Sequence, residues 1–201
     1  MDFSPISLVS IALGVGLAAA TGFRVFVPLL IAGLAAKSGY IPLTDGFQWL
    51  GSTTALLTLS TASVIEVLAY YIPGVDHALD LVAGPAAVAA GVVASAAVMA
   101  DIPPAVMWPV AIIAGGGIAG LTKGTTAVMR AKTGLVTGGL ANPVVATVET
   151  ASATGIAVAA IVVPILALIA VGALLYWAAR KAGRVLFGRK RSAPPGQAPY
   201  N

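Results

Sequence analysis

Cysteine is absent from this chain of 201 residues, and histidine occurs once, as His77. Without thiols the protein has no disulfides, no thiolate metal site and no cysteine nucleophile. One histidine leaves too few ligands for a zinc or haem site built from the protein alone, and it has no catalytic context. We therefore expect no catalytic site, no metal and no cofactor.

Charge is also scarce, because 9% of the residues are charged whereas 59% are hydrophobic. A soluble domain carries roughly 25% charged residues, so this chain has too few polar groups to cover its surface in water. The apolar blocks are continuous, unlike the alternating segments of about ten residues in an outer-membrane barrel. The composition therefore predicts an all-α, polytopic helical membrane protein.

Five apolar blocks and one ambiguous segment follow one another along the chain. The blocks span residues 6–36, 49–72, 76–100, 105–131 and 153–179, and the ambiguous segment spans residues 135–152. If that segment crosses, as a broken or re-entrant span, Arg130 and Lys132 join the basic tail in the cytoplasm, as the positive-inside rule requires. We therefore predict about six transmembrane segments in a bacterial inner membrane, with both termini cytoplasmic.

The basic residues gather near the C-terminus, where six of the eleven lie between Arg180 and Arg191. We interpret residues 1–180 as one transmembrane domain and residues 181–201 as a basic, proline-containing, disordered cytoplasmic tail. Such a tail suits anionic lipid headgroups better than nucleic acid. The lipid bilayer is thus the main expected partner.

Glycine-rich stretches predict close helix packing and a weak internal repeat. Gly14 with Gly16, and residues 115–117 with Gly120, form small-residue faces that suit helix packing or a homo-oligomer. GVGLAAAT at residues 14–21 resembles GGGIAGLT at residues 115–122. Two halves of three segments each would form an inverted repeat, and chance similarity of Ala/Gly-rich sequence is the alternative.

Four charged residues lie deep in apolar surroundings, namely Arg24, Glu66, Lys123 and Glu149. A charge at the bilayer centre costs at least about 2.5 kcal/mol, so such residues face the bundle interior and have partners. Arg24 suits either a bound anion or an internal ion pair with Glu66 or Glu149. Glu66 suits either proton-linked transport or an ion pair, and Tyr70, one turn later, shares its helical face.

Helix-breaking residues interrupt the same apolar regions. Thr21-Gly22 interrupts the first block, Gly84-Pro85 the third, and Asn142-Pro143 the ambiguous segment. Non-helical backbone at membrane depth is tolerated where protein buries it or where it lines a cavity. We therefore predict a substrate- or ion-binding site at these breaks. Its side chains are Arg24, Glu66, Lys123, Asn142 and Glu149, and its backbone is that of Thr21, Gly22, Gly84, Pro85 and Pro143.

Asp76, His77 and Asp80 follow a Pro-Gly turn at the start of the third block. Asp76 in the first turn favours helix capping. Three oxygen and nitrogen donors within five residues also leave a weak cation site open.

Several of these residues together resemble a known family. Gly22-Phe23-Arg24, Glu66 followed by YYIPGVDHALD, and Asn142-Pro143 with Glu149 are similar to a bacterial integral membrane family, the domain of unknown function 4126 (DUF4126). The similarity covers most of residues 6–179 and is most specific at residues 66–80. It implies a multi-pass membrane protein with no established activity.

Two functions of different classes fit these observations. The first is a transporter or channel-like protein for a small solute or ion, because intramembrane charge coincides with helix interruption. The alternative is a non-transporting lipid-binding protein, scaffold or accessory subunit of a membrane complex. In that alternative the charges pair with one another and no wet cavity exists.

Overall fold

The computed structural model of this chain describes residues 5–72 and 75–187, which form helices and turns without a strand. In chain order the helices are α1 (Pro5–Thr21), α2 (Phe26–Lys37), the 3₁₀-helix η1 (Asp45–Gly51), α3 (Thr53–Ala69), α4 (Val75–Ala97), α5 (Pro104–Val110), the π-helix η2 (Ala111–Gly116), α6 (Gly117–Thr137), α7 (Asn142–Val162) and α8 (Pro164–Phe187). The predicted all-α class is confirmed. α8 extends into the predicted tail, and residues 188–201 lie outside the described residues.

Three helical stretches are long and apolar enough to cross a membrane, namely Ala78–Ala97, Pro104–Thr137 and Asn142–Val162. η1 and α3 form a pair bent by 65° that makes a fourth candidate. α1, α2 and the described apolar part of α8 are shorter. The predicted helical membrane protein is thus confirmed, whereas six spans are not.

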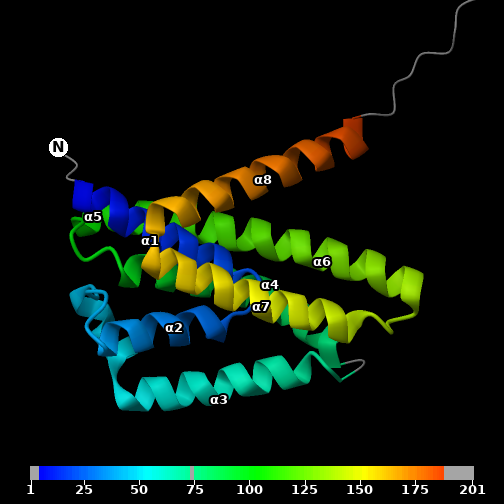
Figure 1. Ribbon diagram of the computed structural model, residues 1–201, viewed down its shortest axis with the longest axis horizontal. Coiled ribbons are helices and arrows are strands. Elements are labelled where there is room, and N and C mark those ends of the chain that lie inside the picture. The colour runs from blue at the N-terminus through cyan, green and yellow to red at the C-terminus, as the bar shows by residue number, and fades with distance from the viewer. Residues whose placement is uncertain (1–4, 73–74, 188–201) are drawn as a thin grey trace, which may run out of the picture.

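α1 and α2 form a hairpin that enters the bundle and returns to the end from which it came (Figure 1). Near its tip, the Thr21 hydroxyl lies 3.3 Å from the carbonyl oxygen of Ala87, in the middle of α4. At its outer end, Ser10 hydrogen-bonds Asp101 just beyond α4, and Thr44 bonds the last carbonyl of α4. The predicted break after Thr21 is confirmed, because α1 ends at this residue and α2 runs back in the opposite direction (Figure 1).

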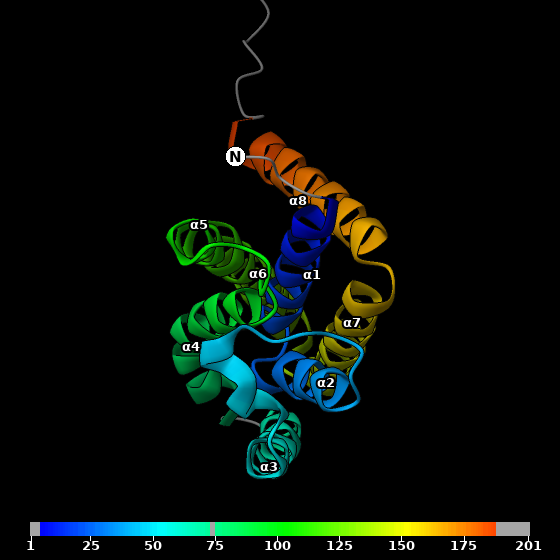
Figure 2. The same cartoon turned by 90° about the vertical axis from the view of Figure 1, so that its left-hand side faces the viewer.

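α1 is the central helix, with α2, α4, α6, α7 and α8 around it (Figure 2). Leu17, Ala18 and Ala20 are completely enclosed. Small residues let the neighbouring helices approach closely, because a Cβ on Gly16 would lie 2.7 Å from the Ala160 Cβ. The predicted glycine face of α1 therefore packs against helices of the same chain.

A second predicted break, at Gly84-Pro85, is wrong, because both residues lie within the continuous helix α4. Proline removes one backbone hydrogen bond, but the helix continues from Val75 to Ala97 on either side of it. The structure instead places a break at Val163, which divides the last apolar block between α7 and α8. Pro164 begins α8 and has no N–H to continue the preceding helix.

The ambiguous segment 135–152 is not a span of its own. Its first residues end α6, a turn follows at residues 138–141, and its remainder begins α7. Asn142 and Pro143 open that helix, where a proline without an N–H costs no helical hydrogen bond. The non-helical backbone predicted here is thus the turn, with positive φ angles of 62° at Gly138 and 87° at Gly139.

The inverted repeat is not confirmed. The two similar stretches, residues 14–21 and 115–122, lie in α1 and in η2–α6, which run in the same direction through the bundle (Figure 1). An inverted repeat requires equivalent helices to run in opposite directions.

A matched pair of glycines in α4 tests the helix packing. A Cβ on Gly91 would lie 2.5 Å from the Ala119 Cβ and 2.9 Å from the Gly115 carbonyl oxygen, whereas a Cβ on Gly84 meets nothing within 4 Å. We expect Gly91→Ala to lower the free energy of unfolding by about 1–3 kcal/mol through overpacking. Gly84→Ala should leave it unchanged or raise it by up to about 1 kcal/mol. Thermal unfolding in detergent measures both, and an equal Tm would contradict the packing.

Candidate functional site

Seven acidic and basic side chains meet where the hairpin tip reaches α3, α4, α6 and α7. They are Arg24, Glu66, Asp76, Asp80, Lys123, Arg130 and Glu149. All are buried except Asp80, whose side chain is 22% exposed. We call these seven residues the charge cluster.

Arg24 follows α1 at the hairpin tip and is bound mainly by α7. Its Nε donates to the Thr150 hydroxyl at 3.0 Å and its Nη2 to the Ala146 carbonyl at 2.9 Å. Its Nη1 lies 3.5 Å from Glu149 Oε2. These three partners lie within about one turn of α7. Of the two glutamates predicted to pair with Arg24, Glu149 therefore makes the close contact.

Glu66 of α3 caps the start of α2 instead. Its Oε1 accepts from the Val25 N–H at 2.7 Å, and its Oε2 accepts from the Phe26 N–H at 3.1 Å. Val25, the residue that precedes α2, has a side chain that cannot cap the helix. The N-terminus of a helix has unpaired N–H groups and a partial positive charge, which favour a carboxylate. A helix N-terminus inside the bundle thus holds an anion, and that anion belongs to the chain itself.

Glu66→Gln tests this cap. The amide keeps one acceptor oxygen and loses the charge, so we expect unfolding to become easier by about 1–2 kcal/mol. Thermal unfolding in detergent gives the change, and hydrogen exchange at Val25 and Phe26 should accelerate. Thr61→Ala is the matched control, because this exposed hydroxyl of α3 bonds only its own helix. A Glu66→Gln variant as stable as Thr61→Ala would show that the cap does not matter.

Asp80 of α4 joins two of the three cations of α6, Lys123 and Arg130. Its Oδ1 accepts from Lys123 Nζ at 2.9 Å and from the Tyr70 hydroxyl at 3.2 Å, and its Oδ2 lies 3.5 Å from Arg130 Nε. Lys123 and Arg130 are about two helical turns apart, so they share one face of α6. Arg130 Nη2 also bonds the carboxylate of Glu149. Ion pairs therefore connect α4, α6, α7 and the hairpin tip.

Tyr70, at the C-terminal end of α3, lies among the cations. The guanidinium carbons of Arg24 and Arg130 lie 4.1 and 4.6 Å from its ring centroid, and Lys123 Nζ lies 5.5 Å from it. An aromatic face attracts cations electrostatically. The ring thus helps three like charges to share a small volume.

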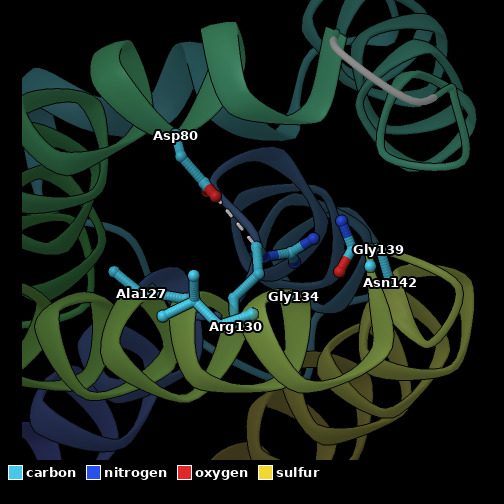
Figure 3. A pocket seen from close by; sticks show the side chains of 9 residues that line it. Asp80, Ala127, Arg130, Gly134, Gly139 and Asn142 are labelled. Carbon is cyan, nitrogen blue, oxygen red and sulfur yellow. Dashed lines mark ion pairs between the residues drawn. The ribbon is translucent and has the colours of Figure 1, made fainter.

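A pocket of about 600 Å³ opens beside the charge cluster, between α4, α6 and the α6–α7 turn (Figure 3). This size lies within the usual range for small-molecule sites. Its lining consists of Asp80, Ala127, Arg130, Ala131, Gly134, Leu135, Gly138, Gly139 and Asn142. Figure 3 shows Asp80 on one side and Arg130 and Asn142 on the other. Asn142 Nδ2 donates to Asp76 Oδ2 at 2.6 Å, which fixes the orientation of its amide.

Several buried polar atoms of this region have no hydrogen-bond partner among the described residues. They are Nη1 of Arg24, Nε and Nη1 of Arg130, Oδ1 of Asn142 and Oε1 of Glu149. A buried polar atom left unsatisfied costs about 1–3 kcal/mol, so such atoms point to bound water or a ligand.

The structure brings together all five side chains that the sequence proposed for the site. Arg24, Glu66, Lys123 and Glu149 belong to the charge cluster, and Asn142 lines the pocket beside it. Of the predicted backbone positions, Thr21 and Gly22 lie at the hairpin tip and Pro143 begins α7 with Asn142. Gly84 and Pro85 do not line the pocket.

Sequence reasoning missed Asp80 and Arg130 as members of this site. Arg130 was expected at the cytoplasmic surface, yet it is 5% exposed and pairs with Glu149. Its spacing from Lys123, which puts both cations on one helical face, is the signal that points to it. Asp76 lies in the first turn of α4, as expected for capping.

The weak cation site left open at residues 76–80 finds no support. Asp80 is paired with Lys123 and Arg130, and Asp76 accepts from Asn142. Within residues 5–72 and 75–187, no three histidine, cysteine, aspartate or glutamate side chains are grouped to hold a metal ion. The side chain of His77 lies outside the described part of the structure.

The fold and the charge cluster together define a helical membrane protein with a helical hairpin, α1–α2, and buried ion pairs at the tip of that hairpin. The model of the family described as domain of unknown function (DUF4126) matches residues 11–184. The chain belongs to this family, as the resemblance of its motifs predicted. No curated protein and no solved structure matches the chain.

Proposed function

We propose that this protein is a small transporter or channel-like protein that moves a small solute or ion past the charge cluster. The supporting observation is the pocket of about 600 Å³ that reaches Asp80 and Arg130 next to the hairpin tip. Ionisable residues inside a membrane commonly mark solute pathways. Half-helices that end at mid-depth are typical of transport sites.

The arrangement of the helices supports a topology with five crossings and one re-entrant hairpin. The crossing elements are α3, α4, the run from α5 to α6, α7 and α8. The C-terminal ends of α6, which carries Lys132, and of α8, which carries Arg180, Lys181 and Arg184, lie toward one end of the bundle (Figure 1), and the positive-inside rule assigns that end to the cytoplasm. The pocket then opens toward the cytoplasm, and the N-terminus faces the opposite side of a bacterial inner membrane, unlike in the sequence prediction.

The alternative, a non-transporting scaffold or accessory subunit, also has a specific observation in its favour. Arg24, Lys123 and Arg130 all have carboxylate partners within the chain. A network of this kind fixes the register of helices without any ligand. The two functions differ in whether the pocket continues into a path for solutes.

Swelling of proteoliposomes tests the proposal. Vesicles in isosmotic sodium salts with gramicidin to admit Na⁺, in neutral polyols, or in alkylammonium salts of the permeant anion thiocyanate swell when the solute enters, and light scattering records the rate. We expect one class to enter faster than into protein-free vesicles, and Asp80→Asn to slow that entry. Lys37→Ala is the control, because Lys37 bonds the exposed Thr53 at the other end of the bundle. If no class enters faster than into protein-free vesicles, transport is refuted and the scaffold is favoured.

A further inference from the structure

We propose that the pocket binds a small uncharged solute, a primary carboxamide with a compact apolar body, through Arg130 and Asn142. This inference rests on the proposed function, since it names the class of solute. It is carried by the balance of charge at the pocket wall, by one donor and one acceptor that are buried there without partners, and by the apolar surface of the same wall.

The charged groups of the pocket wall neutralise each other. Among the described residues that line the pocket, one carboxylate, Asp80, faces one cation, Arg130, and Asp80 Oδ2 lies 3.5 Å from Arg130 Nε. The whole charge cluster holds four carboxylates against three cations. Because charges interact strongly in a low-dielectric interior, the cluster does not attract a further anion.

A cation finds no free carboxylate oxygen at this wall either. Asp80 Oδ1 accepts from Lys123 Nζ at 2.9 Å, and Asp80 Oδ2 faces Arg130. Glu149 pairs with Arg24 and Arg130 and does not line the pocket. A charged ligand would thus lose its hydration without gaining an unpaired opposite charge. The pocket therefore favours a ligand without net charge.

Arg130 and Asn142, which are 5% and 8% exposed, each leave one hydrogen-bonding atom unused. Arg130 Nη2 bonds Glu149 and its Nε pairs with Asp80, but its Nη1 is buried without a partner among the described residues. Asn142 Nδ2 donates to Asp76, which leaves Oδ1 of the same amide buried without a partner. Both side chains line the pocket, and Figure 3 shows the guanidinium group of Arg130 directed toward the amide of Asn142. A ligand that bridges them needs one acceptor and one donor.

A primary carboxamide supplies both groups from one planar unit. Its carbonyl oxygen accepts from Arg130 Nη1, and its NH₂ donates to Asn142 Oδ1. A carboxylate of the same shape has no N–H for Asn142, and an amidinium has no acceptor for Arg130. Because a buried polar atom left without a partner is costly, the site prefers the amide to both charged analogues.

The pocket wall also has room for an apolar body. Ala127, Ala131 and Leu135 of α6 supply apolar surface, and its burial by an apolar group of the ligand adds affinity. A Cβ on Gly134 would meet nothing nearer than Asn142 Oδ1, at 3.9 Å, so this glycine leaves the space beside the amide open. Benzamide combines a primary carboxamide with a compact apolar ring and is the probe for this site.

Calorimetric titration of the full-length protein in lipid nanodiscs tests the inference, with empty nanodiscs as the blank. Benzoate and the benzamidinium ion have nearly the shape of benzamide but carry opposite charges at neutral pH, and each should bind at least about tenfold more weakly. Acetophenone keeps the carbonyl but lacks the N–H, and should bind about five- to tenfold more weakly, the effect of one hydrogen bond. Either ion binding as tightly as benzamide would overturn the uncharged ligand. If benzamide does not bind, the unused atoms hold water only and the inference is wrong.

Asn142→Leu separates the hydrogen bond from the fold, because leucine has a similar shape but no acceptor. Benzamide should then bind no more tightly than acetophenone, while the affinity for acetophenone should stay the same. A general loss of structure would weaken both ligands alike, so the difference between them reports the contact itself. Benzamide that keeps its advantage over acetophenone in this variant would refute the role of Asn142.

A matched pair of glycines in α6 tests the location of the site. Gly134→Leu places a side chain in the pocket and should abolish benzamide binding. Gly124→Leu is the control, because Gly124 is exposed, does not line the pocket, and has open space where its Cβ would lie. Benzamide binding that survives Gly134→Leu, or is lost equally in both variants, would refute this pocket.

The two proposals fail in different ways. On this inference the neutral polyols are the class expected to enter the vesicles faster, since they combine donors and acceptors without charge. If benzamide does not bind while vesicles admit a salt instead, the inferred ligand class is wrong and the transport function stands. If benzamide binds at this pocket while no solute enters vesicles, the binding site stands and transport is wrong.

Discussion

Replacing Glu149 by alanine is expected to lower the free energy of unfolding by about 3–5 kcal/mol, the cost of removing one partner from a buried ion pair. The Glu149 carboxylate lies between the guanidinium groups of Arg24 and Arg130, both of which are buried. Without it, both cations lose their nearest opposite charge on α7. Because a typical domain has only about 5–15 kcal/mol in total, much of the variant should be unfolded in detergent at 37 °C.

Two further variants make this prediction specific. Thr154→Ala, on the same helix, removes an exposed hydroxyl that bonds only its own helix, and should leave the Tm unchanged. Glu149→Met combined with Arg24→Met should recover part of the loss, because apolar residues often replace a buried pair at little cost. A Glu149→Ala protein as stable as Thr154→Ala would show that the ion pairs contribute nothing.

A cysteine placed before Met1 is expected to react from the same side of the membrane as Tyr40→Cys. The α1–α2 hairpin returns to its starting end, and Tyr40, which follows α2, is 81% exposed. Leu140→Cys, in the α6–α7 turn and 86% exposed, should react only from the other side. The native chain has no thiol to interfere. A membrane-impermeant maleimide on right-side-out and inverted vesicles makes the measurement.

The outcome distinguishes a hairpin from a crossing helix. If the first apolar block crossed the membrane once, the added cysteine would react together with Leu140→Cys. Asp101→Cys is a useful reference, because Asp101 bonds Ser10 of α1 at the outer end of the hairpin. It should react from the same side as Tyr40→Cys in either case.

Composition was enough to predict that the protein lies in a lipid bilayer and that its buried charged side chains cluster together. A chain with 9% charged residues places most of its surface in lipid, and the cost of charge in lipid requires Arg24, Glu66, Lys123 and Glu149 to find partners. This reasoning holds for any arrangement of the helices. The cost of charge in lipid therefore predicted which residues form the cluster, but not how the helices are arranged around it.

The sequence did not predict that the chain reverses its direction after Thr21. Residues 6–36 are apolar enough for one long helix or two short ones, and the choice depends on Glu66, which binds the start of α2 from 41 residues away. Gly84-Pro85 also carried a helix-breaking signal, yet α4 continues through both residues. The local sequence pattern indicates how readily a segment forms a helix. Tertiary contacts decide between conformations of similar free energy.

The attachment of the hairpin tip to α7 sets an order for assembly during synthesis. Arg24 donates to the carbonyl of Ala146, which lies 122 residues later in the chain. At about 5–20 residues per second of translation, the arginine waits on the order of ten seconds before that helix emerges from the ribosome. Until then its guanidinium needs water or the insertion machinery beside it. The hairpin that begins the chain therefore reaches its final position only after most of the bundle has been made.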